Sequence, residues 1–528
     1  MSFIPELISA YFQILPDAQD PQQRVAFGTS GHRGCSRTGS FNETHIRAIA
    51  QAVAEYRKNA GVTGPLFLVA DTHALSTPAL GTALSVLVAN GVDVRLDSAQ
   101  RPVATPLVSR AILSHNAEAT EQADALILTP SHNPPEDGGI KYNGPDGGPA
   151  SSDTTGWIER RANELLADGG EAIPTVALER ARERAGHYDF VTHYVAALSE
   201  VVDMEAIAGS GLRLGVDPMG GATLSVWEAI REHYGVAITL TQPRVAPDFA
   251  FLDPDHDGRI RMDCSSEHAM ASAIAKRDDF DLVVANDADG DRHGIVDAGG
   301  LLNPNHFLSV CIDYLLTHRP DWPASLGVGK TAVSSAMIDR VVNDHGRALE
   351  ECPVGFKWFV EGLRAGRIGF AGEESAGASF LDRQGRPWST DKDGLILALL
   401  AAEIQAVTGE TPGACYRRLT HRFGEPHYRR VDQPATAEAK AAIKALGRGD
   451  MEGRQFAGET VTHAFSQAPG NGAPLGGIKV VLPSGWLALR PSGTEALCKL
   501  YAESFRDETH LEALVGDGQR LLSQLVGE

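Results

Sequence analysis

Paired cysteines are missing from this sequence. Its 528 residues include six cysteines, and none of them belongs to a Cys-x-x-Cys pair: Cys35, Cys264, Cys311, Cys352, Cys415 and Cys498. This scatter argues against a zinc site and a disulfide framework, and it is typical of free thiols in a reducing cytosol. The N-terminal segment also lacks a basic stretch followed by an apolar core. No signal peptide is therefore predicted, and a cytoplasmic location is expected.

An excess of positive charge and a long apolar run are missing too. The formal net charge is -21, which argues against a general nucleic-acid-binding or membrane-surface protein, because either would need a basic excess. The most apolar helical stretch, residues 394–407, is short and contains Glu403, so no segment is expected to span a membrane. An anionic substrate must therefore be held in a local basic pocket.

The sequence does contain a repeated pattern of strand, loop and helix. Apolar runs that end in loops rich in Gly, Asp, Ser or Pro lie at 66–70, 125–128, 212–216 and 281–285. Helical periodicity is found at 76–89, 305–317 and 393–407. This alternation predicts an α/β fold, in which ligands gather beyond the carboxyl ends of the strands.

The C-terminal part of the chain reads differently. Residues 477–482 and 486–490 predict a hairpin, and residues 511–526 predict a closing helix. A chain of this length predicts three or four domains. We expect boundaries near residues 205, 305 and 428, which gives domains at 1–205, 206–305, 306–428 and 429–528.

Three alternating carboxylates form the first candidate site. Asp287, Asp289 and Asp291 lie in NDADGDRHG (286–294), directly after an apolar run, and alternation places all three on one side of an extended loop. Three hard oxygen ligands suit Mg²⁺ or Ca²⁺ rather than zinc or copper. An EF-hand is excluded because Arg292 and Ala298 stand where that loop needs Gly and Glu. The alternative is an acidic surface turn.

A serine on a stiff loop is the second candidate. Ser131 lies in TPSHNPPEDGGIKYN (129–143) after another apolar run, with His132 beside it and Lys141 ten residues further on. The alternative is a proline-stiffened turn with a capping serine. No Gly-x-Ser-x-Gly motif is present. A serine near a carboxylate-bound metal favours phosphoryl chemistry, because a serine phosphate gives the metal its missing oxygen ligand.

Two loops combine arginine with exposed backbone, as phosphate sites do. FGTSGHRG (27–34) contains Arg33, and RPSGTE (490–495) contains Arg490, Ser492, Gly493 and Thr494. Gly329-Lys330-Thr331 imitates the end of a nucleotide-binding P-loop, but Ala324 stands where the first glycine is required. No nucleotide site is predicted.

These loops, together with GEESAG (372–377), resemble the α-D-phosphohexomutase superfamily, and within it the bacterial α-phosphoglucomutases. The resemblance covers nearly the whole chain and extends to several further motifs: DTHALS (71–76), GVDPMGG (215–221), RMDCSSEHAM (261–270), VSSAMIDRVVND (333–344), VGFKWF (354–359), GASFL (377–381) and STDKDG (389–394). It implies four domains around a central cleft. Three are related mixed-sheet α/β domains, and the fourth is a C-terminal α+β domain resembling the TATA-binding protein.

The resemblance also assigns roles. It implies that Ser131 carries the phosphoryl group, and that Asp287, Asp289 and Asp291 bind Mg²⁺ together with the phosphoserine. Arg33 and Arg292 flank the phosphoserine, His132 and Lys141 belong to the serine loop, and Lys141 and Lys392 are candidates for acid–base work. Glu373, Ser375 and Lys357 match sugar-binding loops, while Arg490, Ser492, Gly493 and Thr494 match the distal phosphate clamp, which Lys499 could supplement. As alternatives, His132 serves only its own loop and Lys357 is solvated beside Trp358.

The implied function is interconversion of glucose 1-phosphate and glucose 6-phosphate through glucose 1,6-bisphosphate, with small sugar phosphates as partners and a homodimer as the family-level expectation. A phosphomannomutase or dual-specificity hexomutase is the nearest alternative. A phosphatase and a non-catalytic descendant of the mutases are the others. Retention of Ser131, the three aspartates and both lysines argues against the last.

Overall fold

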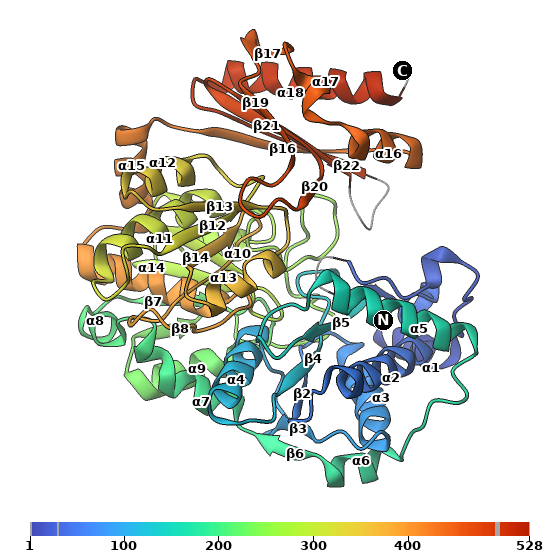
Figure 1. The fold of residues 1–528 in the computed structure, drawn as a ribbon. Helices are drawn as coiled ribbons and strands as arrows, with labels where there is room; N and C mark the ends of the chain where they lie inside the picture. Colours follow the sequence, from blue (N-terminus) through green and yellow to red (C-terminus); the bar gives the residue numbers. More distant parts are fainter. Residues whose placement is uncertain (1–2, 29–30, 492–496, 527–528) are drawn as a thin grey trace. The chain divides into compact units, whose positions relative to one another are not determined.

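The computed structural model describes residues 3–28, 31–491 and 497–526 (Figure 1). The chain divides by compactness into two units, which are described separately. The first comprises residues 1–302, 360–366 and 375–411, and the second comprises residues 303–359, 367–374 and 412–528. No single helix among the described residues is long and apolar enough to cross a membrane.

The first unit opens with a six-stranded mixed sheet in the order β1-β5-β4-β2-β3-β6. Its strands are β1 (His32–Cys35), β2 (Leu66–Ala70), β3 (Val94–Asp97), β4 (Asp124–Leu128), β5 (Asp137–Asn143) and β6 (Gly186–Tyr188). Its helices are α1 (Ile4–Gln13), α2 (Glu43–Ala60), α3 (Ser76–Ala89), α4 (Thr105–Glu118), α5 (Ser152–Ala167), α6 (Leu178–Arg184) and α7 (Phe190–Ala197). β2, β3, β4 and β6 run parallel, and β5 lies antiparallel between β4 and β1.

Helices cover both faces of this sheet, which explains why its central strands are continuously apolar. Leu66, Leu68, Leu126 and Leu128 pack with α2, α3 and α5 in one buried cluster. α4 packs against β4 and α7. The antiparallel β5 follows β4 with no helix between them, and residues 129–136, called the serine loop below, connect the two strands.

A second mixed sheet completes the core of the first unit, in the order β11-β10-β9-β7-β8. Its elements are α8 (Met204–Gly209), β7 (Leu214–Asp217), α9 (Leu224–Tyr234), β8 (Ile238–Leu240), α10 (Ala271–Ala275), β9 (Leu282–Asn286), β10 (His293–Asp297) and β11 (Gly300–Leu301). Later segments add α13 (Val360–Arg364), β15 (Gly377–Phe380) and α14 (Gly394–Thr408). α14 packs on β9, β10 and β15 and is buried over most of its length, as an apolar core helix should be.

The second unit joins a parallel sheet to an antiparallel one. β12 (Gly327–Thr331) lies between β13 (Leu349–Cys352) and β14 (Ile368–Glu373), with α11 (Pro304–His318), α12 (Met337–Asp344) and α15 (Pro412–Phe423) beside them. The C-terminal elements are β16 (His427–Pro434), α16 (Ala437–Ala445), α17 (Arg448–Met451), β17 (Gln455–Phe456), β18 (Glu459–Thr460), β19 (His463–Gln467), β20 (Pro474–Leu482), β21 (Gly485–Pro491), β22 (Leu497–Ser504) and α18 (Glu508–Val526). Five of these strands form an antiparallel sheet in the order β16-β22-β21-β20-β19, and α16 and α18 cover one face of it (Figure 1).

The predicted fold class is confirmed: α/β domains with mixed sheets precede a C-terminal domain with an antiparallel sheet. The predicted strand at 66–70 and the predicted helix at 76–89 coincide with β2 and α3, and the C-terminal hairpin is β20–β21. The predicted domain boundaries remain predictions.

Candidate active site

The serine loop holds Ser131 in an unusual backbone conformation. Ser131 follows β4 by three residues and has φ 60°, in the left-handed region. For a residue with a Cβ this conformation costs ~1–2 kcal/mol. Strained residues persist where the surrounding structure holds them, and they cluster at functional sites. Ser131 is also buried, with 1% of its surface exposed.

The three aspartates lie in the tight connection between the antiparallel strands β9 and β10. One carboxylate oxygen from each of Asp287, Asp289 and Asp291 lies within 4.8 Å of the others, and all three side chains are buried. Ser131 belongs to the same cluster, because its hydroxyl donates to Asp287 Oδ2 at 2.8 Å. Segments 156 residues apart thus meet at one point.

The donor atoms fit a hard divalent cation. The structure supplies no hydrogen-bond partner, among the residues that it describes, to Asp289 Oδ1 or Asp291 Oδ1, although both atoms are buried. Their other oxygens accept hydrogen bonds, and both oxygens of Asp287 are engaged, by the Ser131 hydroxyl and the Arg292 backbone N–H. Unpaired buried carboxylate oxygens are costly, and an oxygen-seeking cation such as Mg²⁺ would satisfy them.

Two lysines neutralise the outer side of this cluster. Lys141, on β5, places Nζ 2.6 Å from Asp289 Oδ2 and 3.0 Å from Asp291 Oδ2. Lys392, just before α14, places Nζ 3.1 Å from Asp291 Oδ2. Burial alone would lower the pKa of Lys141, but the two carboxylates raise it.

The carboxylates respond differently to their surroundings. Burial, followed by the charges of Asp289 and Asp291, raises the pKa of Asp287 well above its ordinary value. Burial would also raise the pKa of Asp291, but the charges of Lys141 and Lys392 lower it. Of these two carboxylates, Asp287 is therefore the one whose ionised form the surrounding protein charges stabilise less.

Both predicted arginines lie near the same cluster. Arg33 is on β1, paired across the sheet with Gly139 of β5. Its pKa is lowered by burial and by the neighbouring charge of Arg292. Arg292 lies 3.9 Å from a carboxylate oxygen of Asp291 and 3.9 Å from one of Asp263. The charges of Asp289 and Asp291 oppose the lowering of the Arg33 pKa, and an anion bound beside the two guanidinium groups would be stabilised by both.

His132 follows the serine in the loop, and its ring lies near the serine hydroxyl. Its Nδ1 lies 3.5 Å from Ser131 Oγ, and its carbonyl accepts a hydrogen bond from Met262. Burial and the charges of the two arginines lower its pKa well below the ordinary value, so the ring is neutral. His32, in contrast, bonds the backbone of Ala26 and Ser40 and serves its own loop.

Sequence reasoning missed three residues that support these groups. Thr105, the first residue of α4, donates its hydroxyl to Asp289 Oδ2 at 2.7 Å and its backbone N–H to the Asp289 carbonyl at 2.8 Å. Asp391 lies 3.5 Å from Lys392 Nζ and accepts from Asn143 at 2.9 Å. Asp263 lies beside Arg292. Their only signal in the sequence is their position in three short segments, RPVATP (101–106), STDKDG (389–394) and RMDCSS (261–266). The residue spacing within these segments does not by itself predict a metal or phosphate site.

The predicted sugar-binding residues lie on two neighbouring loops of the second unit and just beyond them. Glu373, the last residue of β14, accepts a hydrogen bond from the backbone of Gly355 at 3.0 Å. This bond ties the GEESAG segment to the VGFKWF segment. Lys357 Nζ lies 5.4 Å from the ring centre of Trp358. Ser375 belongs to the first unit, where the next residue, Ala376, has φ 69° and accepts from the His293 backbone.

The predicted distal clamp is only partly visible. Arg490 lies on β21 directly opposite Lys499 of β22, so two cationic side chains share one end of the C-terminal sheet. Within the described part of the chain, Arg490 Nε is buried and has no partner, as expected of a group reserved for an anion. Ser492, Gly493 and Thr494 lie outside the described residues.

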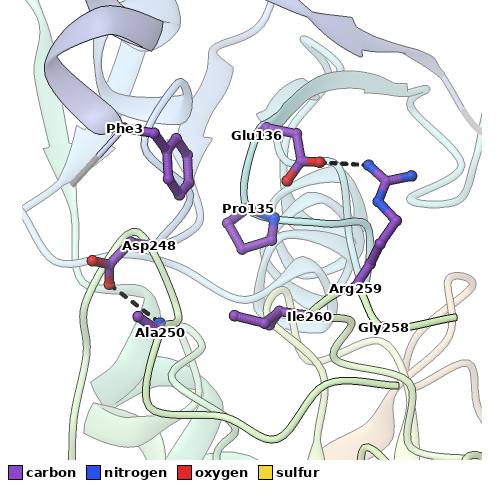
Figure 2. Close-up of a pocket in the computed structure, with 8 residues that line it drawn as sticks. All are labelled: Phe3, Pro135, Glu136, Asp248, Ala250, Gly258, Arg259 and Ile260. Carbon is purple, nitrogen blue, oxygen red and sulfur yellow. Dashed lines mark hydrogen bonds and ion pairs between the residues drawn. The ribbon is translucent and has the colours of Figure 1, made fainter. Parts of the chain in front are cut away.

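An open hollow of about 510 Å³ lies elsewhere on the first unit (Figure 2). It is lined by Phe3, Pro135, Glu136, Asp248, Ala250, Gly258, Arg259 and Ile260. Two of these lining residues, Arg259 and Glu136, form an ion pair of 2.5 Å. None of the predicted site residues lines it, so its size does not make it the reaction centre.

Comparison with known proteins now identifies the family. Residues 24–167, 192–300, 303–423 and 428–517 match, in that order, the α/β/α domains I, II and III and the C-terminal domain of the phosphoglucomutase/phosphomannomutase family. A phosphoglucomutase of Komagataeibacter xylinus is 53% identical over 99% of this chain and 95% of its own length.

Solved structures agree on the fold. The open form of pp63/parafusin, a phosphoglucomutase from Paramecium, aligns with TM-score 0.75 and 20% identity over 98% of this chain and 97% of its own. An Aspergillus fumigatus N-acetylphosphoglucosamine mutase, solved with GlcNAc-6P and magnesium, aligns with TM-score 0.56 and 15% identity over 100% and 99% of the two chains. The resemblance that the loops predict is confirmed, and the chain belongs to the phosphoglucomutase/phosphomannomutase family.

Proposed function

We propose that the protein interconverts α-D-glucose 1-phosphate and glucose 6-phosphate, with Ser131 as the phosphoryl carrier and glucose 1,6-bisphosphate as the intermediate. One observation carries the proposal: a buried serine in a left-handed conformation, 2.8 Å from one of three clustered carboxylates and surrounded by cationic side chains. The 53% identical relative, named phosphoglucomutase, supports glucose over mannose as the sugar.

The transfer balances as an exchange of one phosphoryl group. The bond between phosphorus and the oxygen of phosphorylated Ser131 breaks, and a bond between phosphorus and a sugar hydroxyl oxygen forms. Overall, the hydroxyl proton moves from the sugar to the serine oxygen. Lys141, Lys392 and His132 are the candidates for handling that proton, because they lie nearest to the serine and the carboxylates. The bisphosphate then returns its other phosphate to Ser131 by the reverse step.

Cationic side chains would stabilise the negative charge that spreads over the phosphoryl oxygens in the transition state. Arg33, Arg292 and Lys392 are in position to do so. We assign the divalent ion to Asp287, Asp289 and Asp291 together with the phosphoserine, as Mg²⁺, by its fit to the unpaired oxygens. Mg²⁺ supplies charge neutralisation and polarises the phosphorus when it is bound.

Substrate holding is divided between two further groups. We assign Glu373, Ser375 and Lys357 to the sugar hydroxyls. Arg490, with Ser492, Gly493 and Thr494, is assigned to the phosphate that is not being transferred. A sugar with one phosphate in that clamp can only receive a phosphoryl group from Ser131. An enzyme without phosphate on Ser131 therefore needs the bisphosphate to start.

A coupled assay tests the function. Enzyme stripped of phosphate is given glucose 1-phosphate and Mg²⁺, and glucose 6-phosphate is followed with and without a trace of glucose 1,6-bisphosphate. We expect no conversion without the bisphosphate, full conversion with it, and none in Ser131→Ala under either condition. Equal rates from mannose 1-phosphate would support the dual-specificity alternative. Steady release of inorganic phosphate would support a phosphatase, and conversion by Ser131→Ala would refute the mechanism.

A further inference from the structure

The strained conformation of Ser131 requires a restraint, and a chain of hydrogen bonds from Ser131 through Thr129 to Asp71 supplies one. The Ser131 backbone N–H donates to Thr129 Oγ1 at 2.8 Å. Thr129 Oγ1 in turn donates to Asp71 Oδ2 at 2.6 Å. Since a hydroxyl has one proton, the carboxylate fixes its direction and leaves the oxygen lone pair for the Ser131 N–H. Asp71 therefore acts on the serine through one intervening side chain.

Both carboxylate oxygens of Asp71 accept hydrogen bonds. Its Oδ1 accepts from the Ser76 hydroxyl at 2.6 Å and from the His73 backbone at 2.9 Å. Its Oδ2 accepts from Thr129 and lies 2.8 Å from His73 Nδ1. These bonds and the His73 charge outweigh burial and lower the pKa of Asp71. The side chain is a buried, ionised carboxylate in one fixed orientation.

His73 holds the other side of the serine loop. Its Nε2 lies 3.1 Å from the carbonyl oxygen of Asn133, two residues beyond Ser131. Both ring nitrogens thus face oxygen atoms that can only accept, so both must carry hydrogen and the ring is an imidazolium. Burial opposes that charge, but the Asp71 carboxylate and the hydrogen bonds raise the pKa of His73 above its ordinary value.

A second strained residue holds the histidine ring in place. Phe249 has φ 48°, is fully buried, and packs its ring on His73 with centroids 4.8 Å apart. Its chain neighbours Asp248 and Ala250 line the open hollow, as Figure 2 shows, while Phe249 itself is not part of the lining. The ion pair is buried, since Asp71 and His73 expose 3% and 1% of their surface, and Phe249, on the connection between β8 and α10, packs against the histidine ring.

We propose that the buried His73–Asp71 ion pair is a positioning device that fixes the Ser131 loop from both sides, through Thr129 before the serine and Asn133 after it. The inference rests on the proposed role of Ser131 as phosphoryl carrier. A nucleophile displaced by about 1 Å can lose about two orders of magnitude in rate, so a restraint of this kind affects turnover more than substrate binding.

Thr129→Val tests the proposal, because valine keeps the shape and removes both hydrogen bonds. We expect kcat to fall by about one to two orders of magnitude, with KM for glucose 1-phosphate changed by less than about threefold and with Thr129→Ser close to the unsubstituted enzyme. Thr82→Val is the matched control. Thr82 is a buried threonine of the same unit with two hydrogen bonds, to Tyr11 and Pro78, and neither partner belongs to the serine loop.

Amide hydrogen exchange of the peptide covering residues 129–137 gives a readout that needs no activity. We expect faster exchange there in Thr129→Val and in His73→Gln, and unchanged exchange in Thr82→Val. If Thr129→Val and Thr82→Val have equal kcat and equal exchange in that peptide, the positioning role is overturned. If the unsubstituted enzyme converts no glucose 1-phosphate, the proposed function fails, and the exchange comparison still decides whether the ion pair holds the loop.

Discussion

The left-handed conformation of Ser131 predicts an inversion of the usual order of stability between glycine and alanine variants. Ser131→Ala and Ser131→Gly both lose the hydroxyl and its 2.8 Å bond to Asp287, so both are inactive and their difference isolates the backbone. Removing Cβ at φ 60° relieves ~1–2 kcal/mol, while the extra freedom of glycine in the unfolded chain costs ~0.5–1 kcal/mol. We expect Ser131→Gly to be the more stable by ~0.75 kcal/mol, the difference between the midpoints of these two ranges.

Thermal unfolding in EDTA measures this difference. At ~2.1 cal/mol/K of unfolding entropy per residue, a chain of 528 residues shifts its Tm by about 1 °C per kcal/mol, so the expected rise in Tm is about 1 °C. Ser85 provides the matched control. It lies inside α3 and donates its hydroxyl to the Gly81 carbonyl at 3.0 Å. In that helical position glycine should be less stable than alanine by ~1 kcal/mol. The two pairs of variants must therefore differ in opposite directions. If Ser131→Gly unfolds below Ser131→Ala, the serine does not occupy the left-handed region and the argument for stored strain fails.

Three further predictions concern the metal and the sugar. Asp289→Ala should abolish activity, and it should also abolish the rise in Tm that Mg²⁺ gives the unsubstituted enzyme. That rise corresponds to ~2.7 kcal/mol when Mg²⁺ is in hundredfold excess over its Kd. If the variant keeps its Mg²⁺ response, the ion binds elsewhere. Thr105→Val should raise the Mg²⁺ concentration at half-maximal thermal shift by about 10–100-fold, whereas Thr105→Ser should keep that concentration near the value of the unsubstituted enzyme. Identical Mg²⁺ titration curves for Thr105→Val and the unsubstituted enzyme would contradict a role at the metal. Glu373→Ala should raise KM for glucose 1-phosphate and lower kcat. Ser131 should still be phosphorylated by glucose 1,6-bisphosphate, as measured by mass spectrometry. Equal loss of turnover and of Ser131 phosphorylation would place Glu373 at the phosphoryl site.

Much of the fold could be predicted because its signals are local. The buried parallel strand at residues 66–70 is a run of five apolar residues, and the helix at 76–89 has the expected periodicity and length. The strand predicted at 212–216 begins two residues later, at Leu214. Strand ends are set by pairing with neighbouring strands rather than by the residues themselves, so an error of this size is expected.

The candidate site likewise contains some residues that a local pattern predicts and others that only tertiary contacts reveal. The alternation of Asp287, Asp289 and Asp291 is local, and it predicted their grouping correctly. Nothing local connects Thr105 to Asp289, which are 184 residues apart. Nor could spacing reveal that Asp71 supports Ser131 through Thr129, because that chain of bonds exists only once β2 and β4 are paired. Supporting residues depend on tertiary contacts, and one sequence does not report those contacts.

The charges around the serine support the proposal that a phosphoryl group and a metal bind there together. Three buried carboxylates are opposed by four cationic side chains, those of Lys141, Lys392, Arg292 and Arg33, so these groups sum to a formal charge of about +1 before anything binds. A phosphoserine adds about -1.5 to -2 charges at neutral pH, and a divalent cation adds the opposite amount. The cation alone would raise the sum of these charges to about +3, and an uncompensated charge of that size is costly in a buried site. Bound together they preserve the balance. Lys141 contacts the Oδ2 atoms of both Asp289 and Asp291, and Lys392 contacts that of Asp291. Over the described ranges of the chain the two Oδ1 atoms have no partner, so they are available to a cation.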